Sequence, residues 1–182
     1  MVLRDSVSFM VNHDGMGKGI YLARVDRFRG TVTLTVDIRV RRPYADDSLS
    51  DGDMHTCEHS FATCVREAAA GREDLTVLYF GPMGCATGFY FLLQLVDTVL
   101  ESGYTDIVCC LLKDACLRME MMDVVPANNK YQCGNYLTLL DMDSARVLSS
   151  EIGVLADEAE KRGGFHQYRR LTEEVLSEVL KK

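Results

Sequence analysis

The sequence lacks the features that define several large classes of protein. Its 27 acidic residues outnumber its 20 lysines and arginines, and the formal net charge is -7. The basic residues are dispersed, which excludes the positive patch expected of a nucleic-acid-binding protein. No run of 18 apolar residues is free of charge, and the first 15 residues do not resemble a secretory signal. We therefore expect a cytoplasmic protein with a small-molecule ligand, and neither a nucleic acid nor a membrane as a partner.

Disulfide bonds and a dinucleotide cofactor are not expected either. The seven cysteines are odd in number and irregularly spaced, which favours reduced thiols in a chain that needs no covalent stapling. No GxGxxG fingerprint follows a predicted strand. With 182 residues, 47% of them hydrophobic, the chain is long enough to bury one core, and we expect a single domain.

The first half of the chain predicts a hairpin and a helix. Residues 31–40 alternate strictly between apolar side chains and a polar face that includes Asp37 and Arg39. Residues 19–28 are the expected partner strand across a turn at Arg29-Gly30. We then predict a helix that is capped by Asp51 or Asp53 and ends near Gly71.

The second half predicts further helices around one strand. Residues 75–80 are typical of a buried strand, and the following GPMGCATG is a tight loop before an expected helix at residues 89–101. The next predicted helix is capped by Thr105 or Asp106. Two more helices, separated by Gly163-Gly164, are expected in residues 144–182.

The segment HTCEH carries the first indication of function. His55 and His59 are four residues apart on a predicted helix, so both imidazoles lie on one face and can converge on one metal ion. A third protein ligand is needed, and the best later one is a cysteine in a loop. Glu58, between the two histidines, has the position of a general base acting on bound substrate or water.

HxxEH is also the order of ligands in inverzincin peptidases, so a metallopeptidase is a competing interpretation. Those enzymes usually need a further carboxylate on a later helix, and this chain is small for the class. A third interpretation is a non-catalytic zinc-binding module. It predicts a fourth protein ligand, for which Cys57 and Cys85 are the candidates.

Cys85 lies in the tight glycine-containing loop after the predicted strand at residues 75–80. If a helix follows this loop, free backbone N–H groups and the helix dipole favour a thiolate at this position. Cys85 is then a plausible nucleophile or acid/base group. A small buried cysteine in a tight turn is an equally common alternative.

Three motifs together, HTCEH, GPMGCATGFY and VPANNKYQCGNY, resemble the LuxS family of S-ribosylhomocysteine lyases. The resemblance covers residues 8–148. We therefore predict a lyase domain at residues 1–152 and a helical C-terminal extension at residues 153–182, packed on the same domain. One departure is Gly81, where the family usually has a serine.

The resemblance implies an α+β fold, with a mainly antiparallel sheet flanked by helices, in a homodimer with two shared active sites. It implies the cleavage of S-ribosylhomocysteine to homocysteine and 4,5-dihydroxy-2,3-pentanedione, the autoinducer-2 precursor of quorum sensing. The reaction proceeds by carbonyl migration and β-elimination. The implied cofactor is one divalent metal per subunit, natively ferrous iron (Fe2+), for which Zn2+ or Co2+ can substitute.

The resemblance also implies roles for individual residues. The metal ligands are His55, His59 and Cys133, and the general acid/base pair is Glu58 and Cys85. The implied substrate-binding residues are Arg39, Ser8, Phe9 and His13, of which the last three belong to an N-terminal segment that closes the partner's site. Two simpler interpretations stay open: Arg39 can pair with Asp37 alone, and Ser8 and His13 can be solvated residues near a chain end.

Overall fold

The structure, a computed structural model, describes residues 10–179 as helices and strands joined by short loops. In chain order these are β1 (Gly19–Phe28), β2 (Thr31–Arg39), α1 (Asp51–Ala68), β3 (Leu75–Pro82), β4 (Gly88–Val96), the short 3₁₀ helix η2 (Glu101–Gly103), α2 (Tyr104–Glu120), the 3₁₀ helix η3 (Tyr136–Thr138), α3 (Met142–Arg162) and α4 (Glu173–Val179). The four strands form one antiparallel sheet in the order β1-β2-β4-β3.

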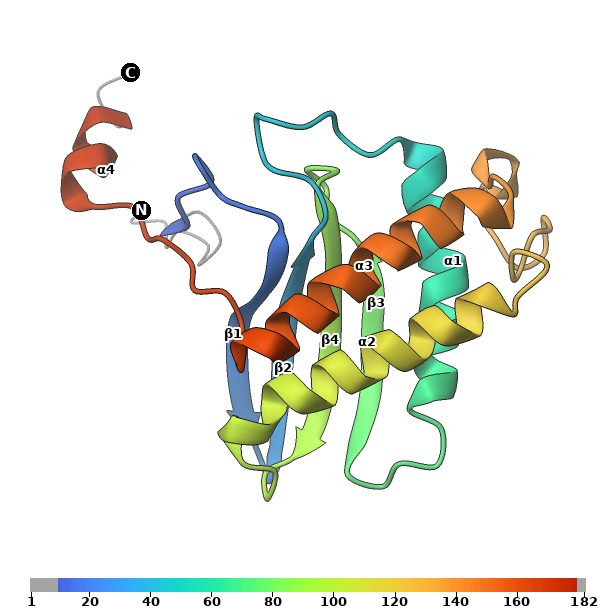
Figure 1. Cartoon of the computed structure of the whole chain (residues 1–182), viewed down its shortest axis with the longest axis horizontal. Helices are drawn as coiled ribbons and strands as arrows, with labels where there is room; N and C mark the ends of the chain where they lie inside the picture. Colours follow the sequence, from blue (N-terminus) through green and yellow to red (C-terminus); the bar gives the residue numbers. More distant parts are fainter. Residues whose placement is uncertain (1–9, 180–182) are drawn as a thin grey trace.

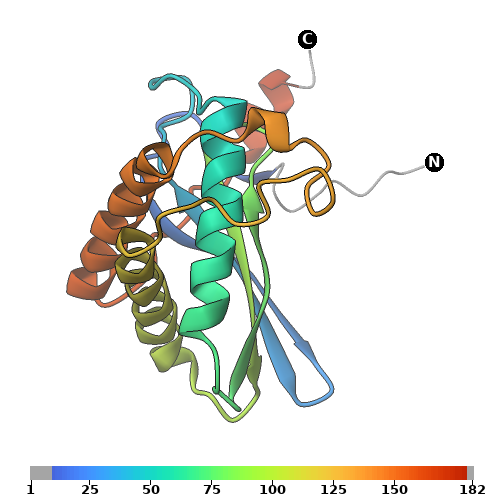
Figure 2. The same ribbon diagram turned by 90° about the vertical axis from the view of Figure 1, so that its right-hand side faces the viewer.

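Helices α1, α2 and α3 cover one face of the sheet (Figures 1 and 2). The core lies between these two layers, and the apolar side chains of β2 that point into it are fully buried. The other face of the sheet carries no helix in the described part of the chain (Figure 2). The fold is therefore a single α+β domain with an antiparallel sheet flanked by helices, as predicted.

The hairpin of β1 and β2 confirms the predicted turn. Arg29 and Gly30 both have positive φ angles, 46° and 79°, as a two-residue turn of the type that matches strand twist requires. The register then places Asp37 opposite Tyr21 and Arg39 opposite Gly19. The polar face of β2 thus ends in a buried acid and a buried arginine, at 1% and 2% exposure.

The helix predicted at residues 89–101 is wrong, because this segment contains β4 (Gly88–Val96), which pairs with both β2 and β3. Side chains on both faces of this strand are nearly all apolar, so its sequence lacks the alternation of apolar and polar residues that predicts a half-buried strand. Phe89, Phe91, Leu93 and Leu95 point into the core. The aromatic residues at its start are typical of a strand.

Two predicted helix caps are also wrong. Ser50 caps α1, and its hydroxyl accepts a hydrogen bond from the backbone N–H of Asp53 (3.1 Å). Helix α2 begins at Tyr104 after η2, so Thr105 and Asp106 lie inside it. Both differences are shifts of one to three residues at a helix start, where the sequence signal is weakest.

The two helices predicted at the C-terminal end are confirmed as α3 and α4. Helix α3 runs without a break through residues 152 and 153 and ends at Gly163, whose φ of 72° is left-handed. None of the helices in residues 10–179 combines the length and apolar character needed to cross a membrane.

Candidate metal centre and active site

The structure brings His55, His59 and Cys133 together. One potential ligand atom from each residue lies within 4.8 Å of the others. The sulfur of Cys133 is 3.4 Å from Nε2 of His55, and the two imidazole rings are nearly perpendicular with centroids 4.6 Å apart. Tetrahedral coordination, with metal–nitrogen bonds near 2.1 Å and metal–sulfur bonds near 2.3 Å, separates such atoms by roughly 3.5 Å. The donor set therefore fits one ion.

Loop residues hold both imidazoles in one tautomer. Thr138 donates its hydroxyl proton to the carbonyl of Asn135 (3.0 Å), so its oxygen accepts the Nδ1–H of His55 (2.7 Å). The carbonyl oxygen of Pro126 can only accept, so Nδ1 of His59 carries the proton in their 2.8 Å hydrogen bond. Each Nε2 is left with its lone pair free for a metal, the usual outer arrangement of a ligating histidine.

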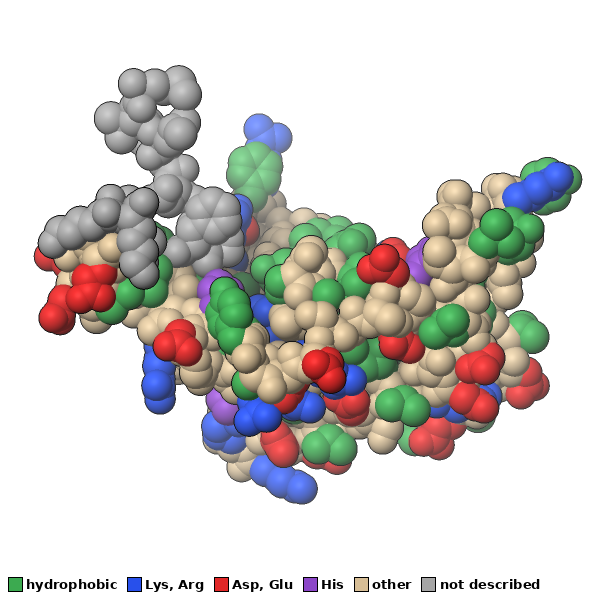
Figure 3. All heavy atoms as spheres, turned by 90° about the horizontal axis from the view of Figure 1, so that it is seen from above, with side chains coloured by type: hydrophobic (Ala, Val, Ile, Leu, Met, Phe, Trp, Pro, Cys, Tyr) green, Lys and Arg blue, Asp and Glu red, His purple; other side chains and the backbone are tan. Residues whose placement is uncertain are grey.

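Cys133 reaches the site from the loop between α2 and α3. Its backbone N–H donates to the carbonyl of Asn129 (3.1 Å), and its sulfur accepts the backbone N–H of Asn135 (3.4 Å). Figure 3 shows the molecule from above the view of Figure 1. Histidine side chains (purple) reach this surface at separate places, and one of them lies beside carboxylates (red).

Neither candidate for a fourth ligand joins the site. Cys57 is fully buried in the core, and burial raises the pKa of its thiol far above the ordinary value. Cys85 lies outside the group of possible ligands. Within residues 10–179 the group therefore has three members, which leaves a coordination position for substrate or water, as in catalytic sites.

Glu58 is half-buried on α1, directly before His59. Helix α1 packs on β3, where burial and then the charge of Glu58 raise the pKa of Tyr79. The hydroxyl of Tyr79 would lie only 2.0 Å from a Cβ atom added to Gly81. Glycine at position 81 thus makes room for the phenol of Tyr79.

Cys85 occupies the turn between β3 and β4, at the same end of the sheet as the start of α1 (Figure 1). No helix follows it, so the predicted helix dipole is absent and other groups act on the thiol. Burial alone would raise the pKa of Cys85, but hydrogen bonds from Thr87 and the charge of Arg39 together lower it below its ordinary value. The sulfur lies 3.0 Å from Oγ1 of Thr87 and 3.4 Å from Nη1 of Arg39.

Arg39 contacts Cys85 as well as Asp37, so the alternative of a simple pair with Asp37 does not account for all of its contacts. Nη2 donates to Oδ2 of Asp37 at 2.5 Å, and Nη1 also donates to Thr87. Burial raises the pKa of Asp37, although Arg39 opposes this effect. Gly88 lies opposite Arg39, and a Cβ there would be 2.1 Å from the carbonyl oxygen of Ile38. Glycine at position 88 therefore lets the Cys85 turn approach β2.

The N-terminal residues that the resemblance predicts to bind substrate are only partly described. Ser8 and Phe9 lie outside the described residues. His13 is half-buried, its Nδ1 is 3.0 Å from the carbonyl oxygen of Val11, and its charge acts on Asp37.

Three residues that contact the candidate ligands and Cys85 were not predicted from the sequence: Thr87, Thr138 and Pro126. Thr87 stands two positions after Cys85 in the same motif, so its proximity was available from the spacing. Thr138 and Pro126 contact the histidines only because the loop folds over α1, and no local pattern indicates this.

Comparisons with known proteins agree with the motifs. A family model described as S-Ribosylhomocysteinase (LuxS) matches residues 7–162. An S-ribosylhomocysteine lyase of Clostridium beijerinckii is 36% identical over 146 residues, which cover 79% of this chain and 86% of the relative. Lyases of the same name from Borreliella burgdorferi (30% identical; 82% of this chain, 90% of the relative) and Clostridium acetobutylicum (37%; 72% and 79%) are also similar.

Proposed function

The chain belongs to the LuxS family of S-ribosylhomocysteinases, and from this premise we propose that it is a metal-dependent carbon–sulfur lyase acting on S-ribosylhomocysteine. The products are homocysteine and 4,5-dihydroxy-2,3-pentanedione, the precursor of autoinducer-2 in quorum sensing. The observation that carries the proposal is the convergence of His55, His59 and Cys133 on one point with a coordination position left open. The peptidase and the zinc-binding module are not favoured, since the relatives share one lyase name and no fourth ligand joins the group among the described residues.

The metal is one divalent ion per subunit, and we propose Fe2+ as the native one, with Zn2+ or Co2+ as substitutes. Two imidazoles and one thiolate suit each of these ions. When bound, the ion supplies Lewis-acid polarisation of the carbonyl and hydroxyl oxygens of the sugar.

Glu58 and Cys85 are the proposed acid/base pair. The carbonyl group must move along the ribose until it is β to the thioether. In each move the carbon beside the carbonyl loses a proton and the former carbonyl carbon gains one, while the proton of the neighbouring hydroxyl passes to the former carbonyl oxygen. Glu58 would take and return protons on the side of α1, and Cys85 on the side of the sheet. A Cys85 thiol whose pKa is lowered by Thr87 and Arg39 is available as a base. The final β-elimination releases homocysteine without net oxidation or reduction, so no redox cofactor is required.

Arg39 and His13 are the proposed substrate-binding groups in the described part of the chain, with Ser8 and Phe9 before them in sequence. Arg39 is already held between Asp37 and Cys85, so its role toward substrate is combined with fixing the thiol. His13 lies close enough to Asp37 for its charge to affect that carboxyl group.

We also propose a homodimer with shared active sites. Side chains of β4 that alternate with its buried core residues, including Tyr90 and Leu92, are only partly buried and point away from the helices, and a second copy could cover them. A cytoplasmic location is supported by the seven cysteines, all of which are free thiols. We propose residues 1–152 as the lyase domain and residues 153–182 as its helical C-terminal extension.

The test is the release of free homocysteine. Protein purified anaerobically and loaded with Fe2+ should produce a free thiol from S-ribosylhomocysteine, together with a dicarbonyl product that a diamine reagent traps. Metal-loaded protein that releases neither product would refute the proposed function.

A further inference from the structure

The C-terminal segment, which we define as residues 165–171, lies beyond the part of the chain that matches the family model. After α3 ends at Gly163, this segment turns back along β1 (Figure 1). The backbone N–H of His166 donates to the carbonyl of Ile20 (2.8 Å), and Phe165 packs against the core. The segment is thus held against the edge of the sheet.

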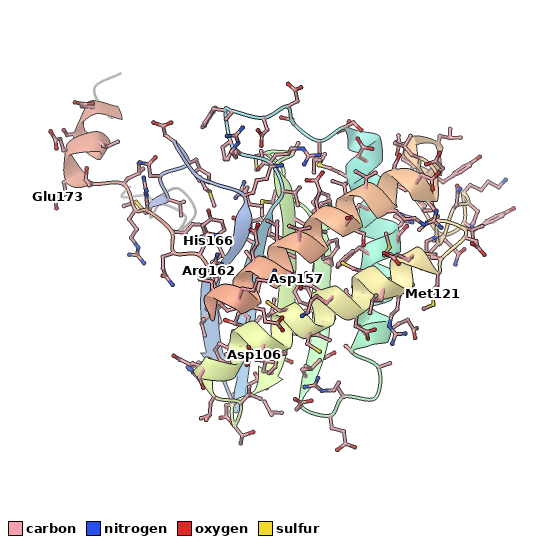
Figure 4. All side chains as sticks on the ribbon, viewed as in Figure 1. Asp106, Met121, Asp157, Arg162, His166 and Glu173 are labelled. Carbon is pink, nitrogen blue, oxygen red and sulfur yellow. The ribbon has the colours of Figure 1, made fainter. Side chains whose placement is uncertain are left out.

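A stack of rings fixes the segment more closely. Tyr21 stacks on His166 and on Tyr168, with centroid distances of 5.0 Å in both pairs. Arg162 and His166 lie next to each other beside β1 (Figure 4), with Nη1 of Arg162 3.0 Å from Nε2 of His166. A Cβ at Gly19 would be 2.2 Å from the His166 ring, so only glycine leaves space for it.

Tyr168 connects this stack to the candidate active site. Its hydroxyl donates to Oδ2 of Asp37 at 2.9 Å, the same oxygen that accepts Nη2 of Arg39. Arg39 in turn contacts Cys85. Burial and the charge of Asp37 raise the pKa of Tyr168 far above its ordinary value, so the phenol stays protonated and remains a donor.

The buried pair of Asp37 and Arg39 has few other partners. Among the described residues, Oδ1 of Asp37 and Nε of Arg39 have no hydrogen-bond partner. A buried charged group that loses one of its bonds is strongly affected, since water cannot replace the bond. Removal of the Tyr168 hydroxyl should therefore disturb the position of the Asp37 carboxylate and its hydrogen bond with Arg39.

The C-terminal segment also forms backbone hydrogen bonds with residues 10–12, which follow the proposed substrate-binding residues Ser8 and Phe9 in the sequence. The backbone N–H of Asn12 donates to the carbonyl of Arg169 (2.7 Å), and that of Leu171 donates to the carbonyl of Met10 (2.9 Å). Val11 and Arg170 pair as in an antiparallel sheet. His13 thus follows directly on a stretch of chain that the C-terminal segment fixes.

We propose that the C-terminal segment is a working part of the active site, in which Tyr168 is a positioning residue that fixes Asp37 and, through it, Arg39 beside Cys85. An effect of Tyr168 on catalysis rests on the proposed lyase function. The contact between Arg39 and Cys85 exists independently of that function, so the two can be tested apart.

The test compares Tyr168→Phe with wild type. Phenylalanine keeps the ring stacked on Tyr21 and removes only the hydroxyl. Two quantities are measured in the full-length protein: the pH dependence of Cys85 alkylation by iodoacetamide, read by mass spectrometry of the Cys85 peptide, and kcat/KM for S-ribosylhomocysteine. We expect the midpoint of the alkylation profile to move to higher pH and kcat/KM to fall about tenfold.

Tyr104→Phe is the matched control. Tyr104 is a buried tyrosine at the start of α2, and its hydroxyl also contacts a charged side chain, that of Arg27 on β1. It should leave the Cys85 profile at its wild-type position. The proposal is overturned if Tyr168→Phe, folded as judged by its melting temperature, has the wild-type alkylation profile. If wild type releases no homocysteine, the proposed function fails, and the alkylation profiles still decide whether Tyr168 positions Arg39.

Discussion

Arg39 donates from Nη1 to the sulfur of Cys85 across 3.4 Å, although the two residues are 46 positions apart in the chain. The pairing of β2 with β4 creates this contact. It places Gly88 opposite Arg39, and the turn that contains Cys85 comes just before Gly88 in the chain. A fixed positive charge beside a thiol lowers its pKa and favours the thiolate.

The first prediction concerns the pH dependence of Cys85. Its thiol should alkylate with a midpoint below its ordinary pKa of 9.0, because Thr87 and Arg39 outweigh the effect of burial. Arg39→Met removes the positive charge, so the midpoint should move upward and the rate at pH 7 should fall. Cys110, which is exposed, gives the comparison within the same digest. Equal midpoints in wild type and Arg39→Met would contradict the assigned electrostatics.

The second prediction concerns Thr138, which fixes the tautomer of His55. Thr138→Val removes the acceptor for Nδ1–H, and the affinity for Zn2+ should fall about 10- to 100-fold, as for other outer partners of ligating histidines. Competition with a chromophoric chelator measures this affinity. Thr63→Val is the control, because Thr63 bonds only the backbone of its own helix at His59. Unchanged affinity in Thr138→Val would show that the hydrogen bond does not orient the ligand.

The third prediction separates catalysis from metal binding. Glu58→Gln and Cys85→Ala should each lower homocysteine release at least about 100-fold, since a general acid/base group contributes at least that much. Metal content should stay at the wild-type level, because neither residue belongs to the donor group. Glu67→Gln, an exposed change on the same helix, should have no effect on either quantity. Loss of metal in Glu58→Gln would mean that the carboxylate is itself a ligand.

The fourth prediction couples Gly81 to Tyr79. Gly81→Ser places a side chain where the phenol lies, so the free energy of unfolding should fall by about 1 kcal/mol. In a Tyr79→Val background that space is free, and the same change should cost less than half as much. Urea unfolding of the four proteins measures the coupling. Additive effects would show that the two positions do not share the space.

The position of His55 and His59 on one face of α1 and the β1–β2 hairpin could be predicted because local spacing determines both. Two histidines four residues apart share a helix face in any helix, and Arg29-Gly30 suits a tight turn by itself. Cys133 was assigned by resemblance, since its distance from α1 depends on the path of a loop. Strand β4, all of which except Gly88 falls in the helix predicted at residues 89–101, escapes prediction because both of its faces are apolar.

The environment of Cys85 was predicted for the wrong reason. A helix dipole was expected to lower the pKa of the thiol, whereas an arginine from another strand and a nearby threonine do so. Contacts across a sheet depend on register, and a single sequence does not specify which residues face each other between distant strands. The contact of Tyr168 with Asp37 could not be predicted for the same reason. The two residues are 131 positions apart, and they meet because the chain lies beside β1 again after α3.

X-ray absorption spectroscopy at the metal edge tests the central claim most directly. For Fe2+- or Zn2+-loaded protein it should show one sulfur near 2.3 Å, two imidazole nitrogens near 2.0 to 2.1 Å and one further light atom. Addition of S-ribosylhomocysteine to a Cys85→Ala variant should change only the light-atom shell. A spectrum without sulfur, or one in which four protein ligands stay unchanged with substrate, would contradict the account.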